Sequence, residues 1–288
     1  MKRYLFVLII VLLNLTSCKN QANYTQKNKI YDDKNVEIDI SSIPQRVITT
    51  SPSLTEIIFD LNEGNKIVGN TTYCDFPEAA KSITKIGNIL SIDYEKVVSL
   101  KPDVIFMLQL HGSEIHYPKL TELGQKIYFF KINNYNDLCR VYRIIGKIFH
   151  KEKLAELNIK RWNQTIDSLK VNIKTKNKAL FLVSAFPIVA ASDKSFINDI
   201  IKFAGFENIC SNVPNEYPLY SEEKILELNP DYIFVRDDIG EILKKYKSWS
   251  KLNAFKNNNV YLYNENLYHR PGPRFIQAVQ ELNRVFIK

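Results

Sequence analysis

The chain has 288 residues, which is enough for two domains of ordinary size. Apolar residues make up 45% of it, as in globular proteins, so the composition excludes a wholly disordered chain. The net charge is +8, but the lysines are scattered and form no dense basic run, so we expect no nucleic-acid partner.

The first residues have the pattern of an export signal. Lys2 and Arg3 precede an apolar run over residues 4–15, which is too short to cross a bilayer. The sequence then reads Leu-Thr-Ser up to Cys18, which resembles a bacterial lipobox. This resemblance implies a signal peptide over residues 1–17, acyl chains on Cys18 and attachment to a membrane through lipid. The alternative is an ordinary secretory signal with an incidental cysteine.

A first α/β lobe is expected over residues 37–150, after a polar stretch at 18–36 that predicts a flexible tether. Short β-rich runs alternate here with helical patterns, which favours a mostly parallel sheet covered on both faces. The expected strands are residues 46–50, 66–69, 104–107 and 126–132, and the expected helices are residues 55–61, 95–100, 117–123 and 138–149.

One long helix is predicted over residues 151–174. This stretch has no proline or glycine, and Trp162, Ile166, Leu169 and Ile173 recur at helical spacing on one face. At 1.5 Å per residue, a helix of this length spans roughly 35 Å, about the diameter of a small domain. We therefore expect a rigid connection between two lobes.

A second α/β lobe is expected over residues 175–288, with the same alternation of strands and helices. Its expected strands are residues 179–183, 232–235 and 260–263, and its expected helices are residues 196–203, 221–228 and 275–286.

The two predicted lobes share a pattern of residues. Residues 95–106 contain E-K and then L-x-P-D-x-I-F, and residues 223–234 contain the same letters at the same spacing. The offset is 128 residues throughout, and an internal repeat of this kind indicates two similar structural units. We therefore predict an α/β protein of two similar lobes with mostly parallel sheets, joined by one long helix, with a ligand cleft between the lobes.

Ligands of open α/β sheets bind beyond the carboxyl ends of the strands. Loops at such positions, and the loop before residue 221, carry aromatic and histidine side chains: Tyr73, Phe76, His111, Phe186, Tyr217, Tyr220, Tyr268 and His269. Side chains of this kind on loops contact either a ligand or a hydrophobic edge of the protein. For the set as a whole we favour a ligand.

Motifs of catalysis and nucleotide binding are missing: the chain has no GxSxG, Walker loop, GxGxxG after a strand or HExxH. His111 and His116 are close in sequence but lack a clear carboxylate partner, which favours solvent exposure over a metal site. Cys74, Cys139 and Cys210 show no metal-binding spacing and cannot all pair, so we expect no disulfide framework. These absences favour a binding protein without enzyme activity, cofactor or metal over a two-lobed enzyme.

Glu95 and Glu223 occupy equivalent positions of the repeat, each in the first turn of a predicted helix. One interpretation is that each carboxylate stabilises its own helix dipole, by roughly 0.3–1 kcal/mol. The other is that the two carboxylates, one on each lobe, bind arginines of a two-fold symmetric partner. The repeat alone is compatible with both interpretations.

Six short motifs run through residues 45–288: Arg46-Val47-Ile48, Ser51-Pro52-Ser53-x-Thr55-Glu56, Val68-Gly69, Tyr73-x-Asp75-Phe76-Pro77, Leu100-x-Pro102-Asp103 and Arg270-x-x-Pro273-Arg274. Together they resemble the substrate-binding proteins of ABC importers for cobalamin, haem and iron–siderophores, and most of all the cobalamin-binding branch. This resemblance implies two α/β lobes, a single connecting helix and modest closure of the lobes on the ligand.

The resemblance also implies roles for particular residues. It assigns ligand contacts to Tyr73, Tyr217, Asn266, Leu267, Tyr268, His269 and Arg270, and permease docking to Glu95 and Glu223. The chain departs from the family pattern where Ile89 and Leu108 replace tryptophans and where Asn266 replaces an acid. Phe76 stands where haem-binding relatives place a ligating tyrosine, which argues against haem.

The expected function is that of a lipid-anchored, extracytoplasmic binding protein. We expect a monomer that captures cobalamin or a related corrinoid and delivers it to a dimeric ABC permease. The alternative within the same fold is a haem or iron–siderophore binding protein.

Overall fold

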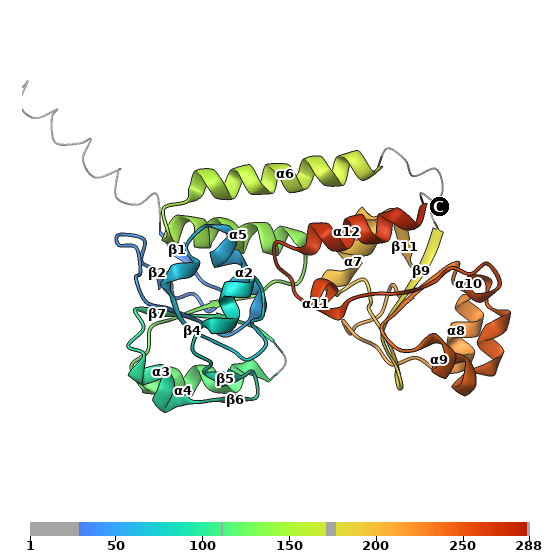
Figure 1. The fold of residues 1–288 in the computed structure, drawn as a ribbon, viewed down its shortest axis with the longest axis horizontal. Coiled ribbons are helices and arrows are strands. Elements are labelled where there is room, and N and C mark those ends of the chain that lie inside the picture. The colour runs from blue at the N-terminus through green and yellow to red at the C-terminus, as the bar shows by residue number, and fades with distance from the viewer. Residues whose placement is uncertain (1–28, 111, 171–176, 287–288) are drawn as a thin grey trace, which may run out of the picture.

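The computed structural model describes residues 29–110, 112–170 and 177–286. Two α/β lobes lie side by side, and one helix, α6 (Glu152–Lys170), runs along the same edge of both (Figure 1). This arrangement confirms the predicted fold class. The predicted signal peptide, Cys18 and the first part of the tether lie outside the described residues.

The first lobe is built on a four-stranded parallel sheet with the strand order β4-β3-β7-β8. Its strands are β3 (Val47–Thr49), β4 (Ile67–Asn70), β7 (Val104–Leu108) and β8 (Ile127–Phe130). Every residue of β7 is buried, because helices cover both faces of the sheet. These helices are α2 (Pro52–Asp60), α3 (Tyr94–Ser99), α4 (His116–Glu122) and α5 (Tyr135–Ile148).

Short elements complete the first lobe. They are the hairpins β1 (Ile30–Tyr31) with β2 (Glu37–Ile38) and β5 (Gly87–Asn88) with β6 (Ser91–Ile92), and the 3-10 helices η1 (Gly64–Lys66), η2 (Glu78–Ser82) and η3 (Ser113–Ile115).

The first lobe begins before residue 37, the boundary expected from the sequence. The reason is Asp32, which is buried although its neighbours are polar. Its carboxylate accepts hydrogen bonds of 2.8 Å from the backbone N–H of Lys34, of Val36 and of Phe129 in β8. The carboxylate thus closes a tight turn and fastens it to the edge of the sheet.

The second lobe has a five-stranded sheet with the order β10-β9-β12-β13, in which β11 also pairs with β9. Its strands are β9 (Asn177–Ala185), β10 (Ile188–Ala190), β11 (Phe206–Asn208), β12 (Tyr232–Val235) and β13 (Val260–Leu262). All pairs are parallel except β10 with β9. The helical elements are α7 (Phe196–Phe203), α8 (Glu222–Leu228), α9 (Ile239–Lys245), η4 (Lys247–Lys251), α10 (Asn253–Lys256), α11 (Glu265–Tyr268), α12 (Phe275–Asn283) and η5 (Arg284–Phe286).

Helix α6 has the apolar face that the sequence predicts, as far as the structure describes it. Trp162 and Ile166 are buried and Leu169 is partly buried, whereas Ile173 lies outside the described residues. The Trp162 ring packs edge-on against Tyr142 of α5, at 4.8 Å between ring centroids, and against Phe275 of α12, at 5.4 Å. One aromatic side chain of the connecting helix therefore contacts both lobes.

The sequence repeat marks equivalent positions in the two sheets. Asp103 donates its N–H to the Arg46 carbonyl at 2.7 Å and accepts the Arg46 N–H on its carboxylate at 2.8 Å. Asp231 makes the same two bonds with Lys178, at 2.9 and 3.2 Å. Each aspartate therefore ties the start of the repeat's strand to the beginning of the neighbouring strand, at Arg46 just before β3 and at Lys178 in the first residues of β9.

The lobes share apolar packing below α6. Tyr135 of α5 contacts Phe203 of α7 at 5.2 Å between centroids and Phe275 of α12 at 5.1 Å. Its backbone N–H also donates to the Asp199 carboxylate of the second lobe at 2.7 Å. One hydrophobic cluster therefore runs from the first lobe into the second.

Candidate functional site

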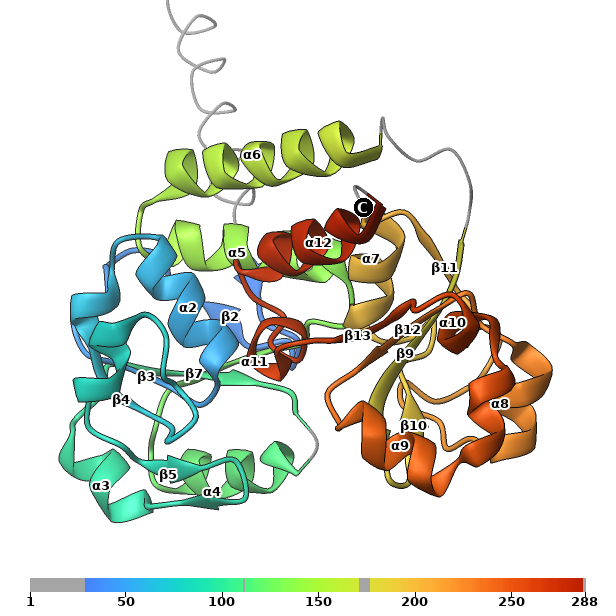
Figure 2. The same ribbon diagram turned by 45° about the vertical axis from the view of Figure 1, so that its right-hand side comes forward.

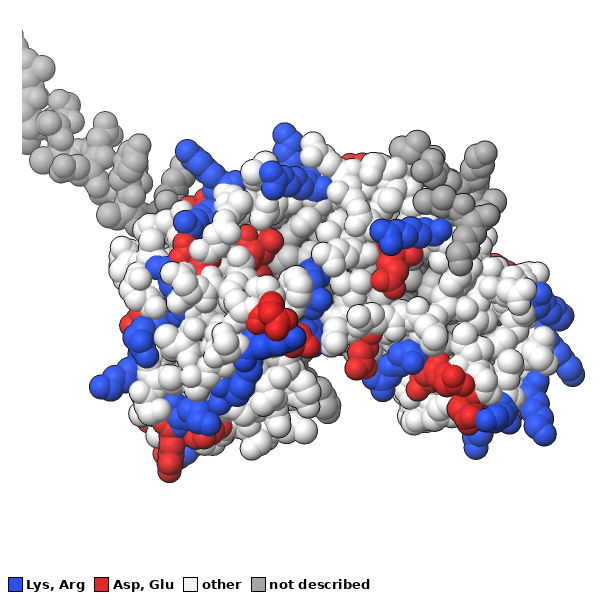
Figure 3. Space-filling view, viewed as in Figure 1, with Lys and Arg blue, Asp and Glu red and all other residues white. Residues whose placement is uncertain are grey.

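A cavity of about 240 Å³ lies between the lobes. The first lobe contributes residues from the carboxyl-end loops of β3, β4 and β7, and from the β5–β6 hairpin; among these are Thr50, Ser53, Thr71, Tyr73, Ile89 and Leu110. The second lobe contributes the segment around α11, with Glu265, Asn266, His269, Arg270 and Pro271. Figure 3 shows a notch between the lobes along their lower edge. The cavity is thus where parallel-sheet proteins bind ligands.

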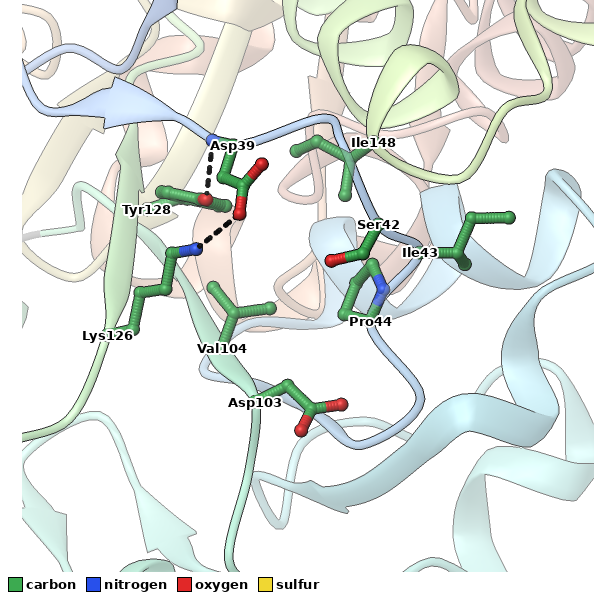
Figure 4. A pocket seen from close by; sticks show the side chains of 9 residues that line it. All are labelled: Asp39, Ser42, Ile43, Pro44, Asp103, Val104, Lys126, Tyr128 and Ile148. Carbon is green, nitrogen blue, oxygen red and sulfur yellow. Dashed lines mark hydrogen bonds and ion pairs between the residues drawn. The ribbon is translucent and has the colours of Figure 1, made fainter.

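A second cavity, of about 320 Å³, lies at the opposite edge of the first-lobe sheet, where the strands begin (Figure 4). It is formed near the amino ends of β7 and β8, where Asp39 and Lys126 form an ion pair of 3.7 Å. The backbone N–H of Asp39 donates to the Tyr128 hydroxyl at 2.9 Å. These groups satisfy one another within one lobe, so we place the candidate ligand site in the interlobe cavity.

The structure brings four of the seven predicted ligand contacts to the interlobe cavity. They are Tyr73, which is 58% exposed, and Asn266, His269 and Arg270. Tyr217 is outside the cavity lining; its side chain is 43% exposed, and burial around its hydroxyl raises the pKa of that group to about 12. Leu267 is also outside the lining.

Tyr268 is part of the core of the second lobe, because its side chain is 1% exposed. Its ring packs against Phe181 and Tyr263, and its hydroxyl donates to the Glu281 carboxylate at 3.0 Å. The side chain therefore does not reach the cavity, contrary to the role implied by the resemblance. Asn266 and His269 reach the cavity because α11 turns them to another face.

Two arginines after α11 cross to the first lobe. Arg270 forms a bidentate ion pair with Asp75 and donates a further bond of 2.6 Å to the Asn266 side-chain oxygen. Arg274 forms a bidentate pair with Glu56, at 2.9 and 2.6 Å. The Glu56 side chain is only 2% exposed. Arg270 is thus engaged by the protein itself at the edge of the cavity.

The electrostatics of these pairs follow from their burial. The Arg270 hydrogen bonds and charge lower the pKa of Asp75. Burial raises the pKa of Glu56, although Arg274 and Arg270 oppose that shift. Glu56 and Asp75 both belong to the motifs that carry the family resemblance, but those motifs predicted no function for them. A charged residue within the apolar run of the helix at residues 55–61 was a signal for a buried partner.

His269 is held in the neutral form within the site. Burial and the charge of Arg236 lower the pKa of this histidine. Its Nε2 lies 3.1 Å from the Tyr263 hydroxyl, which in turn donates to the Leu182 carbonyl at 3.0 Å. Nearby, the Thr50 hydroxyl is buried and has no hydrogen-bond partner among the described residues. Sequence reasoning singled out neither Tyr263 nor Thr50.

The predicted docking residues are equivalent in the structure. Glu95 in α3 follows the capping residue Asp93, and Glu223 in α8 follows the capping residue Ser221, each by two positions. Both glutamates are exposed, and neither forms an ion pair with another described residue. Helices α3 and α8 lie on the outer sides of the two lobes (Figure 2), and none of their residues lines the interlobe cavity.

The described residues hold no group of three or more histidine, cysteine or acidic side chains that could bind a metal ion. His116 is buried rather than solvent-exposed: its Nδ1 lies 2.6 Å from the Tyr94 hydroxyl and its Nε2 lies 3.0 Å from the Ile89 carbonyl. His111 lies outside the described residues. Cys74, Cys139 and Cys210 are buried free thiols. Over the same ranges we find no helix with the length and apolar character of a membrane span.

Comparison with known proteins identifies the family. The family model for periplasmic binding proteins matches residues 47–267. The chain belongs to this family. The match includes the sheets of both lobes and most of the cavity lining, and it ends just before Tyr268.

Relatives of the family cover most of the chain. It is 28% identical to the uncharacterized ABC transporter substrate-binding lipoprotein YvrC of Bacillus subtilis, over 96% of this chain and 93% of that protein. It is 24% identical to the vitamin B12-binding protein of Vibrio vulnificus, over 83% and 88% of the two chains. A possible iron-binding, periplasmic solute-binding protein of Staphylococcus epidermidis has the same fold, with a TM-score of 0.76, 25% identity and coverage of 86% and 100%. All three are named as binding or substrate-binding proteins.

Proposed function

We propose that this protein is the substrate-binding component of an ABC importer and that its ligand is cobalamin or a related corrinoid. The observation that carries the proposal is the meeting of Tyr73 from one lobe with Asn266 and His269 from the other in one cavity. A corrin ring is a broad apolar surface rimmed by amides, so it needs aromatic contacts and a few hydrogen-bonding groups. Membership of a binding-protein family and the vitamin B12-binding relative support this assignment.

The cavity holds only part of such a ligand. Its volume of about 240 Å³ is below the roughly 300–1,000 Å³ of pockets that enclose drug-sized molecules. The remainder of a macrocycle would lie over exposed side chains of the first lobe, namely Tyr73 of the lining, which is 58% exposed, and Leu90 next to the lining residue Ile89, which is 70% exposed. This protein then acts as a carrier without catalysis, works as a monomer and passes its ligand to a dimeric permease.

The alternative is haem or an iron–siderophore, which the possible iron-binding relative supports. The aromatic ring of Phe76 has no hydroxyl to offer to iron, and it lies under the Arg274 guanidinium at 4.1 Å from the ring centroid. His269 is a neutral imidazole, a group that can bind a metal ion, and for this reason haem is included in the binding test.

Titration with cyanocobalamin, cobinamide and haemin tests the proposal, and we expect the corrinoids to bind more tightly than haemin. Tyr73→Ala should weaken corrinoid binding by roughly 1–3 kcal/mol, the scale of one aromatic contact. Tyr217→Ala tests whether the ligand also reaches the second-lobe aromatic. The matched control is Tyr31→Ala, because Tyr31 is an exposed tyrosine on β1, outside the cavity. Unchanged affinity in both Tyr73→Ala and Tyr217→Ala would remove these residues from the site.

We also propose that Cys18 carries the lipid that holds the protein at a membrane, which the lipoprotein name of the Bacillus relative supports. In cells that express Cys18→Ala, the protein is expected in the soluble extracytoplasmic fraction or uncleaved. Ser17→Ala is the control, because it keeps a small residue before the cysteine and should remain lipidated. Fractionation and mass spectrometry of the N-terminus make the comparison. A Cys18→Ala protein with an unchanged mature N-terminus and membrane attachment would show that the lipobox interpretation is wrong.

Docking on the permease through Glu95 and Glu223 is the third part of the proposal. Their equivalence in the two lobes, their exposure and their lack of ion pairs with other described residues support it. A two-fold symmetric partner offers two copies of any arginine cluster, and a pseudo-symmetric protein can bind both at once.

A further inference from the structure

Two side chains of the second lobe face the interlobe cavity with fixed hydrogen-bonding roles. Asn266 and His269 both line the cavity, and they lie three residues apart in the α11 segment, so they share one face. Neighbours of each side chain determine which of its polar atoms remains for a ligand.

Arg270 fixes the orientation of Asn266. Its guanidinium contacts the Asn266 side-chain amide at 2.6 Å. Because a guanidinium only donates hydrogen bonds, the amide atom that faces it is the oxygen. The Asn266 Nδ2 group therefore remains as a donor, and it has no partner among the residues that the structure describes.

Tyr263 fixes the tautomer of His269. A tyrosine hydroxyl has one proton, and that of Tyr263 is donated to the Leu182 carbonyl at 3.0 Å. His269 Nε2, at 3.1 Å from the same hydroxyl oxygen, must then carry a hydrogen and donate it. Burial and Arg236 lower the pKa of His269, so the ring is neutral and its Nδ1 is an acceptor. This Nδ1 has no partner in the described part of the chain.

We infer that Asn266 and His269 form a donor–acceptor pair that recognises a primary carboxamide of the ligand and discriminates against a carboxylate. A carboxamide oxygen accepts from Asn266 Nδ2, and its N–H donates to His269 Nδ1. A carboxylate is an acceptor only, so one of its oxygens would face the Nδ1 lone pair. The buried Thr50 hydroxyl on the opposite wall can donate or accept and does not change this selectivity.

This inference rests on the proposed function, because the amide rim of a corrinoid provides the group that is recognised. It also separates the two ligand classes by chemistry. A haem offers carboxylates at its edge, whereas a corrinoid offers primary amides. Selectivity for an amide would therefore favour corrinoids even though the fold accepts both classes of ligand.

The test compares cyanocobalamin with its monocarboxylic acids, in each of which one side-chain amide is hydrolysed, by calorimetry at neutral pH. For the acid whose changed group meets the pair, we expect the wild type to bind at least about tenfold more weakly than to the amide. Tyr263→Phe frees the tautomer of His269, and the discrimination should fall to about two- to threefold. Tyr268→Phe is the matched control, because it also removes a buried hydroxyl of this lobe but one that bonds to Ala278 and Glu281.

A second variant, His269→Lys, places a donor where the acceptor was, and we expect it to prefer the acid. Equal binding of the amide and of every monoacid by the wild type would overturn the inference and leave corrinoid binding intact. Equal loss of discrimination in Tyr263→Phe and Tyr268→Phe would also overturn it. If haemin binds and no corrinoid does, the proposed function is wrong as well. The complete absence of corrinoid binding distinguishes that result from a failure of the inference alone.

Discussion

Arg274→Ala is expected to lower the free energy of unfolding by about 3–5 kcal/mol. The substitution leaves the Glu56 carboxylate, which is 2% exposed, without the two bonds of 2.9 and 2.6 Å that Arg274 provides. The remaining cation, Arg270, is 3.7 Å away and is already paired with Asp75. A buried charge without a partner costs more than the pair itself contributes.

The pH dependence of the variant gives an independent check. Burial already raises the pKa of Glu56, and Arg274 is the largest opposing influence, so this pKa rises further in Arg274→Ala. An acid with a raised pKa binds its proton more tightly in the folded state than in the unfolded chain. Stability is therefore regained as the pH falls toward that pKa. We expect the loss to be smaller near about pH 5 than near about pH 7.5.

Two further proteins complete the measurement by urea unfolding. Arg274→Ala combined with Glu56→Gln removes the unpaired charge and should recover part of the loss. Arg236→Ala is the matched control, since its ion pair with Glu265 is about half exposed, and we expect a loss of at most about 1 kcal/mol. A loss of that small size in Arg274→Ala would contradict the assignment of the pair as a buried link between the lobes.

Reversing both docking charges, Glu95→Lys with Glu223→Lys, is expected to abolish delivery of the ligand while leaving its binding intact. Both residues lie outside the cavity lining, so ligand affinity should not change. Charge-assisted pairs at the rim of an interface set orientation and association rate, and the two new lysines, which change the net charge by about +4, would repel an arginine-rich partner. Uptake of the ligand by cells is the measurement, together with affinity and melting temperature of the purified variant.

The control must change the net charge equally. Glu122→Lys with Glu207→Lys reverses one exposed glutamate on each lobe, outside the repeat, and should preserve uptake. If each docking glutamate serves only its own helix, the double reversal lowers the melting temperature modestly and uptake stays normal. Normal uptake would therefore refute the docking proposal, whichever way stability changes.

Much of the fold could be predicted from local patterns. The repeated L-x-P-D segment correctly indicated two similar lobes, because Asp103 and Asp231 make the same backbone bonds in both sheets. The stripe on α6 predicted the connecting helix, since Trp162 and Ile166 must be buried somewhere.

Features that depend on distant residues could not be predicted in this way. Arg274 and Glu56 are separated by 218 positions, and no periodicity connects them. Tyr268 and His269 are adjacent in sequence, yet only the second reaches the cavity, because the short turn of α11 directs the first into the core. Polar composition around Asp32 also concealed its packing, since its carboxylate accepts hydrogen bonds from the N–H groups of its own turn and from that of Phe129 in a distant strand.

The aromatic packing of Trp162 and Tyr135 across the lobes, together with the buried Glu56–Arg274 pair, bears on the kinetics of transport. A site whose two halves are already held together needs little rearrangement to capture its ligand. Association then follows a single step whose rate is proportional to ligand concentration, and the residence time reflects the contacts alone. Because the same contacts oppose separation of the lobes, we expect release of the ligand to depend on binding of the carrier to its transporter.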